Sequence, residues 1–322
     1  MTGLLFDLGG TYLRAGVAEH DGSVGHIVKT RIASIADGLS ACCIWPRIED
    51  SMLAYEDDHR YLLEPESPIV LSFPGPIHAG KQILQAPTVS GSGEEAVYDL
   101  PDLISRETKR HVWVLNDVSA AAWYIARTTS RRRFLVVTVS SGIGSKLFDL
   151  CHASGVLDSP AFAGEIGHVV VDDSSDAPIC DCGGRGHLGA ISSGRGIERI
   201  ARKKSGCVLT NERDIVPGFL AGDPWFVSLI RESTRPLARS LLTVAMAAGL
   251  EKVFIMGGFA NALGGAYIDL LSELARDLSC YEVARSHLAS LFEGMPLDHE
   301  TSLYGCAAFL DNEFAAHRKV RG

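Results

Sequence analysis

The chain has 322 residues, which is enough for two domains with separate cores, and its 46% hydrophobic and 21% charged residues exclude a disordered chain. The formal net charge of -9 and the lack of a long basic run argue against a nucleic-acid partner. No leader pattern or membrane-length apolar run is visible, so we expect a cytoplasmic protein without membrane contact. Its eight cysteines should then be mostly reduced thiols or metal ligands.

The first third of the chain predicts strands that alternate with helices. Apolar runs of strand length lie at residues 4–8, 12–18, 69–73 and 112–115. The first two flank a glycine turn and predict a hairpin. Helices are expected over residues 35–55 and 119–126. Pro46 should kink or split the first helix, and Asp117 stands at the capping position of the second.

The rest of the chain repeats this opening pattern. A strand over residues 134–139, a Ser-Gly turn and a second strand predict another hairpin, which indicates a weak internal repeat of two related halves. Further elements are a helix around 236–249, a strand over 252–256 and a helix over 303–316. The alternation indicates an α/β fold. Scattered cysteines are expected to be buried, namely Cys42, Cys43, Cys151, Cys207, Cys280 and Cys306.

Three glycine turns follow predicted strands: the first two have the chemistry that a polyphosphate requires, and the third, Gly257-Gly258, suits contact with a nucleotide base or ribose. Glycine lets backbone N–H groups approach phosphate oxygens, and a carboxylate at a strand end can hold hydrated Mg²⁺. The candidate ATP-binding residues are Asp7, Gly9, Gly10, Thr11, Ser141, Gly142, Gly144, Gly257 and Gly258. Each turn alone also fits an ordinary hairpin or helix start, and none is a Walker P-loop. Three such turns in this order favour a nucleotide site.

Asn116 and Asp117 follow a predicted buried strand and include the candidate catalytic group. Kinases that act on hydroxyl groups use a carboxylate to orient and deprotonate the acceptor, so Asp117 is the candidate general base. The alternative is a simple helix cap, and one aspartate can serve both purposes.

A glycine-rich segment over residues 164–196 holds two imidazoles and two thiols. The candidate metal ligands are His168, Cys180, Cys182 and His187. Their spacing is H-x11-C-x-C-x4-H, and this donor set completes a tetrahedral Zn²⁺ site with no open position, as in structural sites. We expect zinc here in preference to a glycine loop with two incidental thiols.

Together these motifs resemble one family over nearly the whole chain, the ROK group (repressor, open reading frame, kinase). The matching segments are Asp7-Leu8-Gly9-Gly10-Thr11 and Ser141-Gly142-Ile143-Gly144 for phosphate, Phe73-Pro74-Gly75-Pro76, Ala86-Pro87-Thr88 and Asn116-Asp117 for the sugar, and Gly164-Glu165-Ile166-Gly167-His168 with Cys180-Asp181-Cys182-Gly183 for zinc. The last pattern is specific, whereas the glycine turns alone are not.

The resemblance implies two RNase H-like (actin/hexokinase-like) domains around a central cleft. The first would comprise residues 1–117 with a C-terminal helix at about 303–322, and the second residues 118–302. It also implies transfer of the ATP γ-phosphoryl group to a primary hydroxyl of a hexose or hexose mimic, with Mg²⁺, structural Zn²⁺ and a homodimer. The implied substrate-binding residues are Gly75, Thr88, Asn116, Asp117, Glu165 and His168.

Three positions depart from the family pattern. His187 replaces a cysteine ligand, which Zn²⁺ accepts. Gly189 stands where a glutamate usually contacts hydroxyls near the anomeric carbon, and Thr88 replaces an asparagine. We therefore expect a modified hexose, such as an amino sugar, or a carbocyclic sugar mimic instead of plain glucose. The alternative is a non-catalytic sugar-sensing regulator or metabolite-binding protein of the same family. Regulators of the family carry an N-terminal helix-turn-helix, for which we expect no room here because the first predicted strand begins at about Leu4.

Overall fold

The computed structural model describes residues 2–78, 80–86, 88–91, 98–152, 154–158, 160, 162–279, 281–295 and 300–320. The strands are β1 (Gly3–Leu8), β2 (Tyr12–Ala18), β3 (Val24–Arg31), β4 (Ile69–Phe73), β5 (Ile77–His78), β6 (Gln82–Ile83), β7 (Val112–Asn116), β8 (Arg133–Val139), β9 (Ile143–Asp149), β10 (Lys252–Met256) and β11 (Phe292–Gly294). The helices are α1 (Ala41–His59), α2 (Leu100–Thr108), α3 (Asp117–Thr128), α4 (Leu188–Ser192), α5 (Gly194–Ser205), α6 (Val216–Leu220), α7 (Pro224–Ala248), α8 (Gly258–Leu263), α9 (Gly265–Leu278), α10 (Glu282–Leu288) and α11 (Thr301–Val320). Pro87 and Cys280, which the sequence analysis used, lie outside the described residues.

The chain divides into two compact units. The first comprises Met1–Ser130, Ser159–Ala161 and Asp298–Gly322, and the second comprises Arg131–Asp158 and Phe162–Leu297. The sequence analysis ended the first domain at residue 117 and so assigned α3 to the second. In the structure α3 belongs to the first unit, because it packs extensively against α11.

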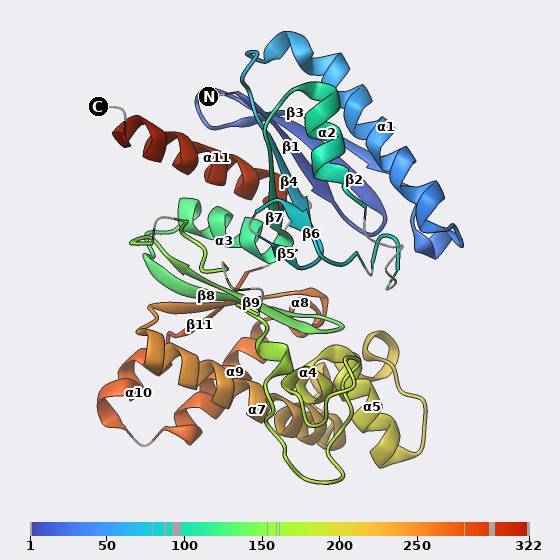
Figure 1. The fold of residues 1–322 in the computed structure, drawn as a ribbon. Helices are drawn as coiled ribbons and strands as arrows, with labels where there is room; N and C mark the ends of the chain where they lie inside the picture. The colour runs from blue at the N-terminus through green and yellow to red at the C-terminus, as the bar shows by residue number, and fades with distance from the viewer. Residues whose placement is uncertain are drawn as a thin grey trace. The chain divides into compact units, whose positions relative to one another are not determined.

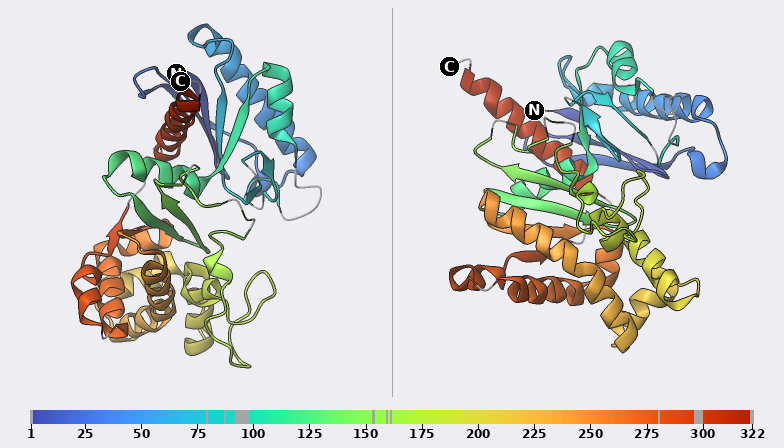
Figure 2. Two further views of the ribbon diagram at one scale, coloured as in Figure 1. Left: turned by 60° about the vertical axis from the view of Figure 1, so that its left-hand side comes forward. Right: turned by 60° about the horizontal axis from the view of Figure 1, so that its bottom comes forward.

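The first unit is built on a five-stranded sheet of order β3-β2-β1-β4-β7 (Figure 1). β1 and β2 form the expected antiparallel hairpin, and β4 and β7 continue the sheet parallel to β1. Helices α1 and α2 cover one face, and α3 and α11 cover the other (Figures 1 and 2). Both faces are covered, so every residue of β1 and β4 is buried, which explains their continuous apolar runs.

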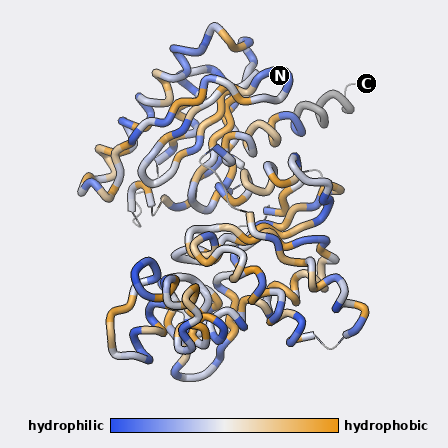
Figure 3. Tube along the Cα trace, turned by 180° about the vertical axis from the view of Figure 1, so that it is seen from behind, coloured by the Kyte–Doolittle hydropathy of each residue, from blue (hydrophilic) through white to orange (hydrophobic). Residues whose placement is uncertain are grey.

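The second unit repeats this arrangement in a four-stranded sheet of order β11-β10-β8-β9. β8 and β9 form an antiparallel hairpin, while β10 and β11 run parallel to β8. Helices α7 and α9 pack on one face over Leu135, Val137 and Val139. Figure 3 shows hydrophobic residues gathered along the strands of both units, with hydrophilic residues in many of the connecting loops. Both sheets contain an antiparallel hairpin with a glycine turn, to which later strands are added in parallel, so the predicted internal repeat is confirmed.

Two helix predictions differ from the structure. The helix expected over residues 35–55 is interrupted before Pro46 and not at it, because Gly38 adopts φ 74° and ends a separate 3-10 turn. Pro46 then lies inside a continuous α1. Helix α7 begins at Pro224, well before residue 236, because the side chain of Asp223 caps it by accepting from the backbone N–H groups of Trp225 and Phe226.

The prediction of buried cysteines is largely wrong. Cys42, Cys43, Cys151 and Cys207 are exposed, and Cys306 alone among the described members of that group is buried. Their short side chains lie in helix starts and turns on the surface, where no packing requires them. Within the described parts of the chain, no helix combines the length and apolar character needed to cross a bilayer.

Candidate functional site

The carboxyl ends of β1, β4 and β7 bring several predicted residues to one edge of the first sheet. These strands are parallel, so the turn after β1, the turn after β4 and the start of α3 meet at that edge. A Cβ added at Gly10 would lie 3.0 Å from the carbonyl oxygen of Thr88. The predicted phosphate turn is therefore in contact with a predicted sugar residue.

Asn116 joins two of these segments. It is the N-cap of α3, so the expectation that Asp117 occupies the cap is wrong by one position. The Oδ1 atom of Asn116 accepts from the backbone N of Val118 at 3.0 Å, and its Nδ2 donates to the carbonyl of Gly75 at 2.8 Å. A Cβ at Gly75 would lie only 2.4 Å from the carbonyl oxygen of Gln85, so glycine is required there. Asn116 thus has a structural role that the sequence did not reveal.

Asp117 is the first residue of α3 and is half-buried. Its Oδ1 accepts from the backbone N of Val118 at 2.9 Å, which orients the carboxylate at the helix N-terminus. A carboxylate fixed in this way at the functional edge of a sheet can accept a proton from a bound hydroxyl group.

Asp7 has a partner that the sequence analysis missed. The Nη1 of Arg14 donates to its Oδ2 at 2.8 Å, and Asp7 is 8% exposed. The hairpin register could have revealed this pair, because Asp7 and Arg14 are directly opposite each other on β1 and β2. Arg14 restrains the carboxylate that we expect to hold hydrated Mg²⁺.

The second and third glycine turns lie side by side at the carboxyl ends of β8 and β10. A Cβ at Gly257, where φ is 104°, would lie 2.7 Å from the carbonyl oxygen of Val139. Gly144 packs against Thr138, whereas a Cβ at Gly142 would meet nothing within 4 Å. The backbone around Gly142 is therefore open to a ligand.

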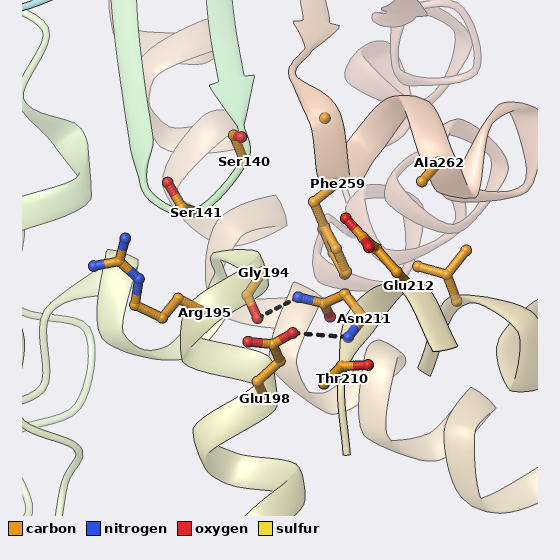
Figure 4. Close-up of a pocket in the computed structure, with 12 residues that line it drawn as sticks. Ser140, Ser141, Gly194, Arg195, Glu198, Thr210, Asn211, Glu212, Phe259 and Ala262 are labelled. Carbon is orange, nitrogen blue, oxygen red and sulfur yellow. Dashed lines mark hydrogen bonds between the residues drawn. The ribbon is translucent and has the colours of Figure 1, made fainter. Parts of the chain in front are cut away.

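A pocket of about 780 Å³ opens beside these two turns (Figure 4). Its lining residues are Ser140, Ser141, Gly194, Arg195, Glu198, Thr210, Asn211, Glu212, Val216, Gly258, Phe259 and Ala262. Asn211 braces the floor, since its Nδ2 donates to the carbonyl of Gly194 at 2.9 Å and its backbone N donates to Glu198 at 2.7 Å. The pocket has the volume of a small-molecule site. The sequence analysis found only its glycine turns.

The four predicted metal ligands converge in the second unit. The ligand atoms of His168, Cys180, Cys182 and His187 all lie within 4.8 Å of one another. The Nδ1 of His187 is 3.3 Å from the Sγ of Cys182, and the Nδ1 of His168 is 3.9 Å from the Sγ of Cys180. Bonds of about 2.0–2.3 Å to one ion would place such donors at these separations, so the cluster fits tetrahedral zinc. Burial raises the pKa of the Cys180 thiol.

Glu165 belongs to the same loop as the metal cluster. Its Oε2 is 3.9 Å from the Nε2 of His168, the ring nitrogen opposite the one that faces Cys180. Glu165 and His168 belong to the second unit, whereas the predicted substrate residues Gly75, Thr88, Asn116 and Asp117 belong to the first. The predicted substrate residues are therefore divided between the two units.

Comparison with known proteins assigns the chain to a family. The family model described as "ROK family" matches residues 4–308. The chain belongs to the ROK family. It is 33% identical over 300 residues to a C(7)-cyclitol 7-kinase of Streptomyces hygroscopicus subsp. limoneus, covering 85% of this chain and 84% of that one. It is 27% identical over 290 residues to a 2-epi-5-epi-valiolone 7-kinase of an Actinoplanes species, covering 81% and 78%.

A solved structure of this family has the same fold. The ROK hexokinase from Thermus thermophilus aligns with a TM-score of 0.79 and 24% identity over 98% of this chain and 100% of that one. The expected actin/hexokinase-like fold with two domains is confirmed.

Proposed function

We propose that this ROK protein is an ATP-dependent kinase that phosphorylates the exocyclic primary hydroxyl group of a C7-cyclitol, a carbocyclic sugar mimic. The reaction rests on one observation above all: the half-buried Asp117 lies at the same sheet edge as the glycine turn that follows Asp7. The substrate class rests on the cyclitol kinases among the relatives and on Gly189.

In the proposed reaction Asp117 orients the acceptor and takes its proton. The acceptor oxygen then bonds to the γ-phosphorus, and the bond from that phosphorus to the bridging oxygen breaks to release ADP. Asn116 keeps Asp117 beside the Gly75 turn through the bond from its Nδ2 to the Gly75 carbonyl. Asp7, held by Arg14, would bind hydrated Mg²⁺, which neutralises phosphate charge when present.

The nucleotide would occupy the pocket of the second unit. Ser141, which lines the pocket, and the adjacent Gly142 would meet the phosphates with backbone N–H groups. Gly258, which also lines the pocket, and the adjacent Gly257 would border the nucleoside. Phe259 offers an apolar ring in the same pocket, which suits a base. A single structural Zn²⁺ would hold the loop that carries Glu165 and His168, so both residues would present fixed side chains to the substrate.

Gly189 supports a substrate other than glucose. It lies in α4, and a Cβ there would be 3.2 Å from the carbonyl oxygen of Gly167, between Glu165 and His168 in the sequence. No carboxylate projects from position 189 to accept hydrogen bonds from hydroxyls near an anomeric carbon. A site without that buried acceptor does not penalise a ring that lacks the matching hydroxyl group.

An ADP-release assay over C7-cyclitols, glucose and amino sugars tests the proposal. We expect the highest kcat/KM with a cyclitol such as 2-epi-5-epi-valiolone, and phosphorus NMR of the product should place the phosphate on the exocyclic carbon. A value of about 10⁵ M⁻¹s⁻¹ or more for glucose, above every cyclitol and amino sugar, would contradict the substrate class. Tight sugar binding with no ADP release from any compound would favour the sensing regulator.

A further inference from the structure

One acidic residue of the metal loop is bonded to the proposed nucleotide pocket. Asp181 stands between the candidate ligands Cys180 and Cys182. Its Oδ2 accepts from the Nη1 of Arg195 at 2.6 Å, and its Oδ1 accepts from the Nη2 of Arg199 at 2.5 Å. Arg195 also lines the pocket, whereas Arg199 does not.

Arg195 occupies the start of a helix that is anchored to the phosphate turn. It is the second residue of the 12-residue α5, and the backbone N of Gly194 before it donates to the carbonyl of Ser140 at 2.8 Å. Figure 4 shows the Arg195 side chain on the Ser141 side of the pocket, away from Glu212 and Ala262. The guanidinium group and the positive end of the helix dipole thus lie beside the turn that would bind phosphate.

The charges at this position favour an anion. Two guanidinium groups share one carboxylate, so the cluster of Asp181, Arg195 and Arg199 keeps a net positive charge. A guanidinium group has five N–H donors, so the bond to Asp181 leaves Arg195 donors for a second acceptor. Arg195 is half-exposed, so its long side chain depends on Asp181 for a fixed position.

We propose that Arg195 binds the nucleotide phosphates and that Asp181 is a positioning residue that couples the metal loop to the nucleotide site. One metal ion held by Cys180 and Cys182 fixes the turn that carries Asp181, and Asp181 in turn holds the side chain of Arg195 through their hydrogen bond. By linkage, bound metal then strengthens nucleotide binding, and bound nucleotide strengthens metal binding by the same factor. The inference depends on the proposed nucleotide pocket.

The first test is calorimetric binding of ADP and of adenosine, each to zinc-loaded and to chelator-stripped protein. Arg195→Gln should weaken ADP binding about tenfold, as for loss of a charged hydrogen bond, and leave adenosine binding unchanged. Stripping zinc from the wild type should weaken ADP binding about two- to fivefold, in line with an exposed ion pair. Asp181→Asn should remove that dependence on zinc. Lys204→Gln is the matched control, because Lys204 lies on the same helix as Arg195 and pairs with Glu232 of α7, but does not line the pocket.

The second test measures zinc transfer from the wild type to a chromophoric chelator. ADP should slow the transfer about two- to fivefold in the wild type and not in Asp181→Asn. The inference is overturned if Arg195→Gln binds ADP as the wild type does, if it loses adenosine and ADP binding equally, or if ADP leaves wild-type zinc transfer unchanged. Failure of the wild type to bind ADP at all would overturn the nucleotide pocket as well.

Discussion

Asp117 combines a fixed carboxylate with a place at the start of α3. Asp117→Asn should lower kcat about 10²–10⁴-fold, because the amide keeps the shape of the side chain but cannot take the proton of the acceptor. Substrate affinity should stay within a few-fold of the wild type. Single-turnover kinetics together with calorimetric substrate binding measure the two effects separately.

Asp102→Asn provides the control for that variant. Asp102 lies in the first turn of α2, so the substitution removes a charge from the same kind of helix position within the same unit. It should leave kcat within twofold. A kcat near the wild-type value in Asp117→Asn would exclude Asp117 as the general base.

A substitution at Gly189 tests the substrate class by shifting the specificity toward glucose. Gly189→Glu should raise the ratio of kcat/KM for glucose to that for the cyclitol by about tenfold or more, since it restores an acceptor for sugar hydroxyls. The Gly167 carbonyl must yield by a few tenths of an ångström for the new Cβ. Gly189→Ala carries the same Cβ without the carboxylate, so an equal change in both variants would refute the role of the charge.

At the residue scale, the sequence predicted those residues whose chemistry is local. Asp117 could be found because it follows an apolar strand, and the metal ligands because their spacing is distinctive. Arg14 and Arg195 were missed, because an isolated arginine has no signature until pairing or packing places it beside a carboxylate. The catalytic and binding roles themselves stay predictions.

The turn between β8 and β9 is the element best suited to a test of phosphate access. Gly142→Val should raise KM for ATP at least tenfold and change KM for the sugar substrate little, because the branched side chain would block backbone N–H groups from phosphate. The added Cβ meets no protein atom within 4 Å, so the fold should tolerate it. Gly10→Val is less clean, because its Cβ would press on Thr88. If Gly142→Val raised only the KM for the sugar substrate, the turn between β8 and β9 would belong to the sugar site and not to the ATP site.

The metal loop predicts a pH-dependent metal content. We expect one zinc per chain at pH 7.5, measured by elemental analysis after purification without added metal. Zinc should be lost as the solution is acidified, because the two imidazoles must be neutral and the two cysteines must be thiolates to bind it. His187→Ala should lower the zinc content at pH 7.5, whereas His152→Ala, an exposed histidine of the same unit, should not. Full activity of zinc-free protein would contradict the proposed role of the loop.

At the element scale, strands were predicted better than helix ends. Strands such as β4 and β10 match their predicted bounds because their apolar runs are buried whole. Helix starts depended on single side chains, such as Asp223 for α7 and Asn116 for α3, whose capping bonds appear only in three dimensions.

At the scale of the whole molecule, stability in acid should depend on a buried ion pair in the first unit, formed by Glu56 and Arg110. Glu56 is 3% exposed and accepts hydrogen bonds from Arg110 and Arg60. Burial raises the pKa of Glu56, but the two arginines outweigh it and hold the pKa below its usual value. A lowered pKa in the folded state gives stability above the unfolded-state pKa, and that stability is lost as the pH falls through the folded-state pKa.

Glu56→Gln should therefore lower the free energy of unfolding by about 3 kcal/mol at pH 7, because the substitution leaves Arg110 without its charged partner. Below about pH 4 the effect should be smaller, because protonation then removes the charge of Glu56 in the wild type as well. Urea unfolding followed by tryptophan fluorescence measures it, since Trp45, Trp113 and Trp123 belong to the first unit. Asp57→Asn, which removes an exposed partner of Arg60, should cost under about 1 kcal/mol. If the difference in unfolding free energy between the wild type and Glu56→Gln did not change with pH, the charge of Glu56 would not be the source of the stability.

The architecture of the whole molecule was predicted well because it rests on a repeated pattern. Two hairpins with glycine turns, each followed by later strands, were visible in the sequence and are present in both units. The domain boundary was missed because the contact of α3 with α11 joins segments far apart in the chain. The homodimer remains a prediction.

The two hairpins differ at matching positions, and this difference suggests a history. Asp7 is opposite Arg14 in the first hairpin, and the equivalent pair in the second is Thr138 and Gly144, each one step before the last residue pair of the hairpin. Tandem duplication of one ancestral domain would leave this topology in both halves. In such a history, one copy would carry the charged pair Asp7 and Arg14, and the other the uncharged pair Thr138 and Gly144 beside the open backbone at Gly142. The difference in charge between the two hairpins would then be a product of divergence after duplication.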